Sequence, residues 1–143
     1  MSERMSAKQY REKFIEPKVV SSARIIITDM PPSANGLRKS FIKDGKVVSV
    51  KSDGYANWRK GAVAEIVSQA VGKVDGPYRL SIVAQRHWRS KRARDIDNII
   101  KPVSDALVKA GVVQDDSLAE CVTARWEDDL QGHAAIIDIE AAQ

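Results

Sequence analysis

Short apolar runs separated by turn signals divide the chain into strand and helix segments. Residues 23–30 are rich in β-branched side chains and end at a Pro-Pro pair, which predicts a buried strand followed by a loop. Residues 40–50 place Asp44-Gly45 between two apolar runs, a strong short-range signal for a β-hairpin. Residues 77–87 alternate apolar and polar positions, which predicts a strand with one buried face.

Two further segments have the three- and four-residue apolar spacing of amphipathic helices. The first begins at Ser52 or Asp53 and ends near Gly72. The second carries an apolar stripe over residues 99–110, and Gly111 is typical of the position after a helix C-terminus.

The last apolar segments, residues 117–126 and 134–139, predict a closing pair of strands around the acidic loop 127–132. The order strand, hairpin, helix, strand, helix, two strands predicts an α+β fold with a mixed or antiparallel sheet and two main helices. We expect residues 1–22 to form an N-terminal arm of unknown role and residues 23–143 to form a single domain.

Composition narrows the class of protein. The single cysteine, Cys121, excludes an internal disulfide and a Cys-rich zinc module, and its apolar strand neighbours predict a small buried side chain. No segment approaches the roughly 20 apolar residues of a membrane span, and the N-terminus lacks the apolar stretch of a signal peptide. We therefore expect a cytoplasmic protein without a membrane partner. The net charge is only +4, so the arrangement of charge matters more than its total.

The acidic residues before the second helix are candidates for chemistry. Asp95 and Asp97 are two residues apart, so at an extended strand end both would point to one side while Ile96 points to the core. Asp97 also stands where a helix N-cap is expected, and Lys101 follows one helical turn later. The pattern predicts two carboxylates and an ammonium group at one place.

A third carboxylate, Asp116, follows the second helix. A helix of about a dozen residues advances roughly 18 Å, and the extended residues 112–116 can travel nearly as far back. Clustered carboxylates repel one another unless a cation holds them. Oxygen ligands of this kind suit Mg²⁺, with Mn²⁺ as an alternative.

Basic residues surround these acids and the predicted hairpin, which suits a phosphodiester substrate, because cations can hold the backbone while a metal acts on one phosphate. The run before the acids contains Arg86, Arg89, Lys91, Arg92 and Arg94. The set around the hairpin contains Arg38, Lys39, Lys43, Lys46 and Lys51. Nucleic acid is the polyanion that this arrangement favours, with Lys39 and Lys43 among the candidate contacts.

Residues 94–117 closely resemble a family signature. The segment reads Arg-Asp-Ile-Asp-Asn-Ile-Ile-Lys, then a helix, a glycine and Asp-Asp, and it resembles the RusA family of Holliday junction resolvases. The segment Pro-Pro-Ser-Ala-Asn at 31–35 is similar to that family's N-terminal loop. The resemblance implies a homodimeric, Mg²⁺-dependent endodeoxyribonuclease that nicks four-way DNA junctions symmetrically in recombination and repair.

Carried over by position, the resemblance implies that Asp95, Asp97 and Asp116 are the essential metal-binding acids and that Lys101 is the functional lysine. From the residues alone, the same acids could be a helix cap and solvated turn residues, and Lys101 could form an ordinary surface pair. Asp115 is an alternative ligand to Asp116.

Other functions remain open at this stage. The basic run could be a solvated face or a guard against edge-strand aggregation. Rival activities are a less selective nuclease for flaps and other branched DNA, a non-catalytic junction-binding protein, and an enzyme acting on nucleotides. The sequence also leaves open the number of metals, the cleavage-site preference, the residue that opens the junction, and a host or phage context.

Overall fold

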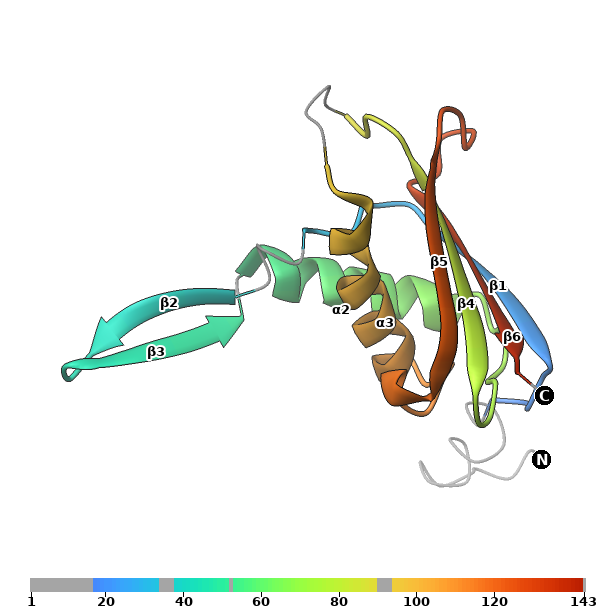
Figure 1. The fold of residues 1–143 in the computed structure, drawn as a ribbon, viewed down its shortest axis with the longest axis horizontal. Helices are drawn as coiled ribbons and strands as arrows, with labels where there is room; N and C mark the ends of the chain where they lie inside the picture. Colours follow the sequence, from blue (N-terminus) through green and yellow to red (C-terminus); the bar gives the residue numbers. More distant parts are fainter. Residues whose placement is uncertain (1–16, 34–37, 52, 90–93, 143) are drawn as a thin grey trace, which may run out of the picture.

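The computed structural model describes residues 17–33, 38–51, 53–89 and 94–142, which form an α+β fold with a mixed sheet and two main helices (Figure 1). In chain order the elements are β1 (Ser22–Ile27), β2 (Arg38–Lys43), β3 (Lys46–Lys51), α2 (Asp53–Ser68), β4 (Tyr78–Gln85), the 3-10 turn η2 (Ile96–Ile99), α3 (Ile100–Lys109), the 3-10 turn η3 (Asp116–Leu118), β5 (Ala119–Glu127) and β6 (Ala135–Ala141). The predicted fold class is confirmed. Among the helices in these residues, none is long and apolar enough to cross a lipid bilayer.

The main sheet has the strand order β1-β6-β4-β5. β6 is antiparallel to both β1 and β4, whereas β4 and β5 are parallel. A parallel pair needs a long crossover, and here the connection carries η2, α3 and η3. The predicted alternation of β4 is confirmed, because Tyr78, Leu80, Ile82 and Ala84 are buried. This crossover carries the candidate acids, with Asp95 and Asp97 before α3 and Asp116 after it.

Both helices lie on the same side of the sheet and build the core there (Figure 1). α3 contributes Val103, Ala106 and Leu107, each with no exposed surface, and α2 contributes Ala62 and Ile66. Burying a Leu or Ile side chain stabilises a fold by about 1.5–3 kcal/mol. The helix that carries the candidate site is therefore anchored by its opposite, apolar face.

The first helix ends at Ser68, earlier than the predicted end near Gly72, and polar side chains at its end bond to the backbone of residues 26 and 28. Gln69 accepts a hydrogen bond from the Ile26 amide at 2.9 Å and donates one to the Ile26 carbonyl at 2.7 Å. Glu65 accepts from the amide and the hydroxyl of Thr28 at 2.7 and 2.8 Å. These bonds satisfy backbone groups on the outer edge of β1, a sheet edge that would otherwise be open.

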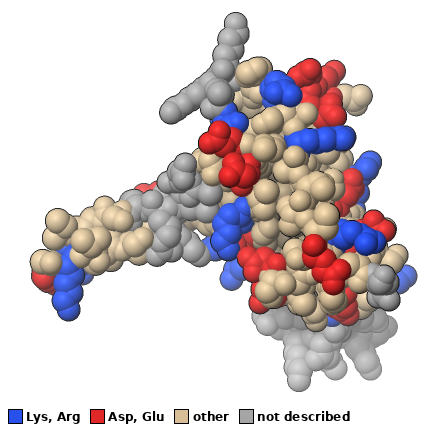
Figure 2. All heavy atoms as spheres, in the orientation of Figure 1, with Lys and Arg blue, Asp and Glu red and all other residues tan. Residues whose placement is uncertain are grey.

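The β2–β3 hairpin projects away from the helices and the main sheet (Figure 1). Asp44 and Gly45 have φ values of 55° and 75°, the left-handed pair that a tight two-residue turn requires, so the hairpin prediction is confirmed. Ile42 and Val47 face each other across the strands and are 77% and 76% exposed. Figure 2 shows basic and acidic side chains exposed together at its far end.

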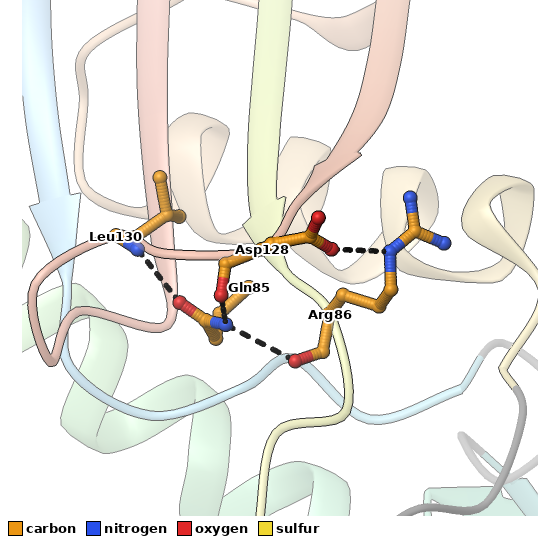
Figure 3. Close-up of polar contacts among 4 residues, drawn as sticks. All are labelled: Gln85, Arg86, Asp128 and Leu130. Atoms are coloured by element: carbon orange, nitrogen blue, oxygen red, sulfur yellow. Dashed lines mark hydrogen bonds and ion pairs between the residues drawn. The ribbon is translucent and has the colours of Figure 1, made fainter.

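The prediction that the last two strands pair with each other is wrong. β4 lies between β5 and β6, so the loop joining them crosses the end of β4. Gln85, the last residue of β4, holds this loop: its amide donates to the carbonyls of Asp128 and Arg86 at 2.6 and 3.1 Å (Figure 3). Its oxygen accepts from the Leu130 amide at 2.7 Å. A single side chain thus stabilises a crossing that strand patterns do not reveal.

β5 forms the second edge of the main sheet, and most of its side chains are exposed. Cys121 is exposed, so the expectation of a small buried side chain is wrong. The apolar residues around Cys121 do not imply burial, because at this edge neither face of the strand is fully covered. Val122, its neighbour, is 38% exposed.

The segment before β1 is attached to the domain where the structure describes it. Val20 donates to the Lys73 carbonyl and Lys73 donates to the Lys18 carbonyl, both at 2.8 Å. A Cβ atom on Gly72 would lie 2.6 Å from the Lys18 carbonyl, and its φ is +91°, so this close approach requires glycine. β1 begins at Ser22, one residue before the predicted domain boundary, while residues 1–16 of the predicted arm lie outside the described residues.

Candidate active site

The turn η2 leads directly into α3, so Asp97 and Lys101 lie on one continuous helical segment. Asp95 precedes η2 in an extended conformation, with φ −83° and ψ 126°. Asp97 is inside η2, so the expectation that both acids project from an extended strand end is wrong. A tight 3-10 turn replaces the strand end, and the period of two does not apply to it.

Asp97 is also not the helix N-cap that the pattern predicted. Asp95 holds the cap position of η2 without a side-chain cap hydrogen bond, and Ile99 holds that of α3. The Asp95 carboxylate instead accepts a 3.4 Å hydrogen bond from the Asn98 amide group. Both acids are exposed, so their oxygens lie at the protein surface.

The chain after α3 brings Asp116 into contact with Lys101, near the start of that helix, while the meeting of Asp116 with Asp95 and Asp97 stays a prediction. Lys101 Nζ lies 3.3 Å from Asp116 Oδ2 and 3.0 Å from Asp105 Oδ1. The hydrogen bond to Asp105 is the main cause that raises the pKa of Lys101; partial burial opposes it, and Asp116 adds to it. The Lys101 side chain therefore keeps its positive charge at neutral pH.

The geometry distinguishes the two adjacent acids. Asp115 is the N-cap of η3, and its Oδ1 accepts a 2.9 Å hydrogen bond from the Ser117 amide. This bond is the main cause that lowers the pKa of Asp115. Asp116 is the one of the pair that contacts Lys101. Asp115 therefore has a local turn role, and Asp116 is the better candidate for chemistry.

Two residues of this network were not singled out from the sequence. Asp105 lies four residues after Lys101, a spacing that signals an ion pair on a helix. Tyr55, on α2, donates a 2.8 Å hydrogen bond from its hydroxyl to Asp105 Oδ2. Tyr55 gives no comparable signal in the sequence, because its contact depends on how α2 packs against α3.

The acids provide the type of oxygen ligand that a hard cation prefers, but the described residues do not hold them in a ready-made metal site. Within residues 17–33, 38–51, 53–89 and 94–142, no group of three or more His, Cys, Asp or Glu side chains is arranged to hold a metal. Mg²⁺ commonly uses only one or two protein carboxylates together with waters and substrate phosphates. The oxygen donors of Asp95, Asp97 and Asp116 therefore fit such an ion in kind, and their assignment as ligands stays a prediction.

The predicted basic contacts fall into three groups. Arg86 pairs with Asp128 at 2.9 Å, beside the hydrogen bonds by which Gln85 holds the β5–β6 loop, which we call the Gln85 clamp (Figure 3). Arg89 Nη1 lies 4.0 Å from Asp29, and its guanidinium lies 5.1 Å from the centre of the Trp88 ring. The first group, Arg86 and Arg89, is thus partly neutralised by acids, although both residues are exposed.

The second group, Arg94 and Lys43, consists of exposed residues in different regions: Arg94 directly precedes Asp95, and Lys43 ends β2. The third group is not described: Lys91 and Arg92 lie outside the described residues, and Lys39 is placed only by its backbone, opposite Val50.

Comparison with known proteins places the chain in a family. The family model for endodeoxyribonuclease RusA matches residues 29–140. The crossover junction endodeoxyribonuclease RusA of Aquifex aeolicus (strain VF5) is 36% identical over 76 residues, which cover 53% of this chain and 58% of that protein. The chain thus aligns with less than two thirds of that relative's length. Because the family match includes most of the chain, the acids and Lys101 among it, the chain belongs to the RusA family of endodeoxyribonucleases.

Proposed function

We propose that this protein is a divalent-metal-dependent endodeoxyribonuclease that resolves four-way DNA junctions by paired, symmetric nicks in recombination and repair. The observation that carries the proposal is the contact of Asp116 with Lys101, on the helix that follows Asp95 and Asp97, in a member of an endodeoxyribonuclease family. The name of the relative, a crossover junction endodeoxyribonuclease, supports a junction as the substrate.

In this proposal Asp95, Asp97 and Asp116 hold Mg²⁺, or Mn²⁺ in its place. Such an ion supplies an activated water and charge stabilisation at the scissile phosphate. The carboxylates are exposed, so waters and a DNA phosphate could supply the remaining oxygen ligands of such an ion.

Lys101 acts as a fixed positive charge beside that phosphate. Two acids keep its ammonium group protonated, which suits electrostatic stabilisation of a developing negative charge rather than removal of a proton. A lysine ammonium serves here as a compact point charge.

The basic residues position the DNA backbone around this site. We assign this role to Arg86, Arg89, Lys91, Arg92, Arg94, Lys39 and Lys43. A homodimer would present two such sites about a two-fold axis, which matches the symmetry of a four-way junction and accounts for paired nicks. The place of action is the cytoplasm, where chromosomal or phage DNA is accessible.

The test is cleavage of an end-labelled synthetic four-way junction with Mg²⁺, with Mn²⁺ and with a chelator. Wild type is compared with Asp97→Asn and with Asp138→Asn, which removes the same charge from an exposed pair on β6. We expect Asp97→Asn to lower the cleavage rate about 100- to 1,000-fold without weakening junction binding, and Asp138→Asn to leave both unchanged.

Three outcomes would change the proposal. Equal cleavage of flaps, three-way and four-way junctions at matched salt would indicate a less selective branched-DNA nuclease. Tight binding without nicks in either metal would indicate a non-catalytic junction-binding protein. Cleavage by Asp97→Asn near the wild-type rate would remove this residue from the site.

A further inference from the structure

A chain of polar contacts connects the core to Lys101. It begins at the Tyr55 hydroxyl, passes through both oxygens of Asp105, and ends at the Lys101 ammonium, with contacts of 2.8 and 3.0 Å. Exposure rises along it: Tyr55 is 2% exposed, while the side chains of Asp105 and Lys101 are 28% and 58% exposed. The ammonium group is thus linked to a buried residue of the other helix.

We propose that Asp105 and Tyr55 are positioning residues that fix the Lys101 ammonium at the edge of the acidic site. This inference rests on the proposed function and extends it to two residues that neither the family match nor the name of the relative identifies. Neither residue touches the substrate in this assignment.

An exposed lysine side chain does not hold one conformation without a partner. Its four-carbon side chain has large rotamer entropy, and an exposed ion pair contributes about 0–1 kcal/mol, too little to hold one geometry. Asp105 differs from a surface partner because a buried tyrosine hydroxyl fixes one of its oxygens, which leaves the other directed at Lys101. A hydrogen bond to a charged acceptor is about twice as strong as a neutral one.

Lys101 has two acidic partners, and they have different roles. Its second contact is with Asp116, one of the proposed metal-binding acids, at 3.3 Å. Asp105 lies on the same helix as Lys101 and is held from α2, so its contact does not depend on Asp116. Asp105 can therefore hold Lys101 in place while the carboxylate of Asp116 binds the metal, as proposed.

The deciding experiment measures the mobility of the Lys101 ammonium and the rate of cleavage in the same variants. In the full chain, nitrogen NMR relaxation of the Lys101 side chain is compared among wild type, Tyr55→Phe, Asp105→Asn and the control Asp138→Asn. We expect greater mobility of the Lys101 ammonium in Tyr55→Phe and Asp105→Asn, and no change in Asp138→Asn. This readout needs no DNA and no cleavage.

Single-turnover cleavage at saturating junction then tests the consequence. We expect about a 5-fold slower rate in Tyr55→Phe, equivalent to the loss of one hydrogen bond, and about 10- to 100-fold in Asp105→Asn, with unchanged junction affinity. In a Lys101→Ala background the same two substitutions should cause no further loss. Unfolding midpoints of all variants separate this effect from a loss of folded protein.

The results distinguish two failures. Unchanged Lys101 mobility, or a full additional loss in the Lys101→Ala background, would overturn the positioning role, because both residues would then act without Lys101. A wild-type protein that binds junctions without cutting them would overturn the proposed function, while the mobility measurement would still report whether Tyr55 and Asp105 hold Lys101.

Discussion

The start of α3 and the β2–β3 hairpin differ in how far the rest of the fold holds their exposed side chains. At α3, the charged side chain of Lys101 connects through Asp105 to a buried tyrosine. On the hairpin, apolar side chains at Ile42 and Val47 are more than three-quarters exposed, and the strands pair only with each other. The first region is ordered by the fold, whereas the second offers a surface that the body of the domain does not cover.

This difference bears on how the protein would engage DNA. Preorganised groups stabilise developing charge without reorganisation during the reaction, which suits the region around Lys101. A two-stranded hairpin is at best marginally stable by itself, so contact with DNA or with a second copy of the chain would stabilise it. In the proposed function, chemistry would thus take place at the packed region, and the exposed hairpin would contact the substrate.

The largest expected effect tests whether the two regions differ in stability. Leu107→Ala removes a fully buried side chain beneath the site and should lower the free energy of unfolding by about 2–5 kcal/mol. Ile42→Ala, on the hairpin, should change it by no more than about 0.5 kcal/mol. Urea denaturation at low protein concentration measures both.

A loss in Ile42→Ala that grows with protein concentration would break this comparison. It would mean that a second copy covers the hairpin, so that the stability of the region belongs to the dimer. Sedimentation of the same variant would then show a shift towards monomer.

A second prediction concerns the salt dependence of junction binding. Lys43→Ala combined with Lys46→Ala removes two exposed cations near the hairpin turn, and should lower the slope of log affinity against log salt by about 2. The cleavage rate at saturating junction should fall far less than in Asp97→Asn, because these residues contact the DNA backbone and not the reacting phosphate. Titration of a labelled junction at several salt concentrations measures the slope.

The matched control is Lys18→Ala combined with Lys109→Ala. It removes the same charge from the segment before β1 and from the last turn of α3. An equal change of slope in both double variants would show that net charge, rather than the hairpin, determines the affinity.

Local signals in the sequence predicted the local structure well. Asp44-Gly45 specified the hairpin turn, and Gly111, with φ +79°, follows the end of α3 as expected. The pairing of β5 with β4 was missed, because strand order depends on contacts distant in sequence and on the Gln85 clamp. The exposure of Cys121 was missed for a related reason, since burial of a strand depends on its place in the sheet.

At the candidate site, too, part of the arrangement could be predicted from the sequence and part could not. Chain length allowed Asp116 to come back towards the start of α3, and its contact with Lys101 agrees with that reach. The helical conformation at Asp97 was not predicted, because the sequence pattern did not distinguish an extended end from a 3-10 start. The link from Tyr55 to Asp105 needs the packing of two helices, which no spacing along one segment can reveal.

A third prediction uses the ionisation of Tyr55. Burial first, and then the hydrogen bond to Asp105, raise the pKa of Tyr55 from its ordinary value of 10.0 to about 12. Between these values the folded state retains a proton that the unfolded chain has lost, so stability is complete below about pH 10 and falls as the pH rises towards about 12. The expected difference is on the order of 1 kcal/mol.

Unfolding measured across this pH range in wild type and Tyr55→Phe isolates the contribution, because all other groups titrate in both proteins. The stability of wild type should decline more steeply than that of the variant. Parallel declines would show that the folded and unfolded states hold this proton equally, and that the hydroxyl is less firmly held than the hydrogen bond implies.

The smallest expected effect asks whether a short distance alone makes an ion pair strong. Arg24 and Asp138 form a two-pronged pair across β1 and β6, with contacts of 2.7 and 3.0 Å, and their side chains are 68% and 40% exposed. A double-mutant cycle with Arg24→Ala and Asp138→Ala should give a small coupling that decreases as salt is added, because solvent screens both groups. The Tyr55→Phe and Asp105→Asn cycle should exceed it and respond less to salt, because Tyr55 is buried. If the Arg24 pair proves the stronger of the two, then a short distance, rather than a buried partner, determines how firmly charged side chains are held on this protein. The contrast between α3 and the hairpin would then lose its physical basis.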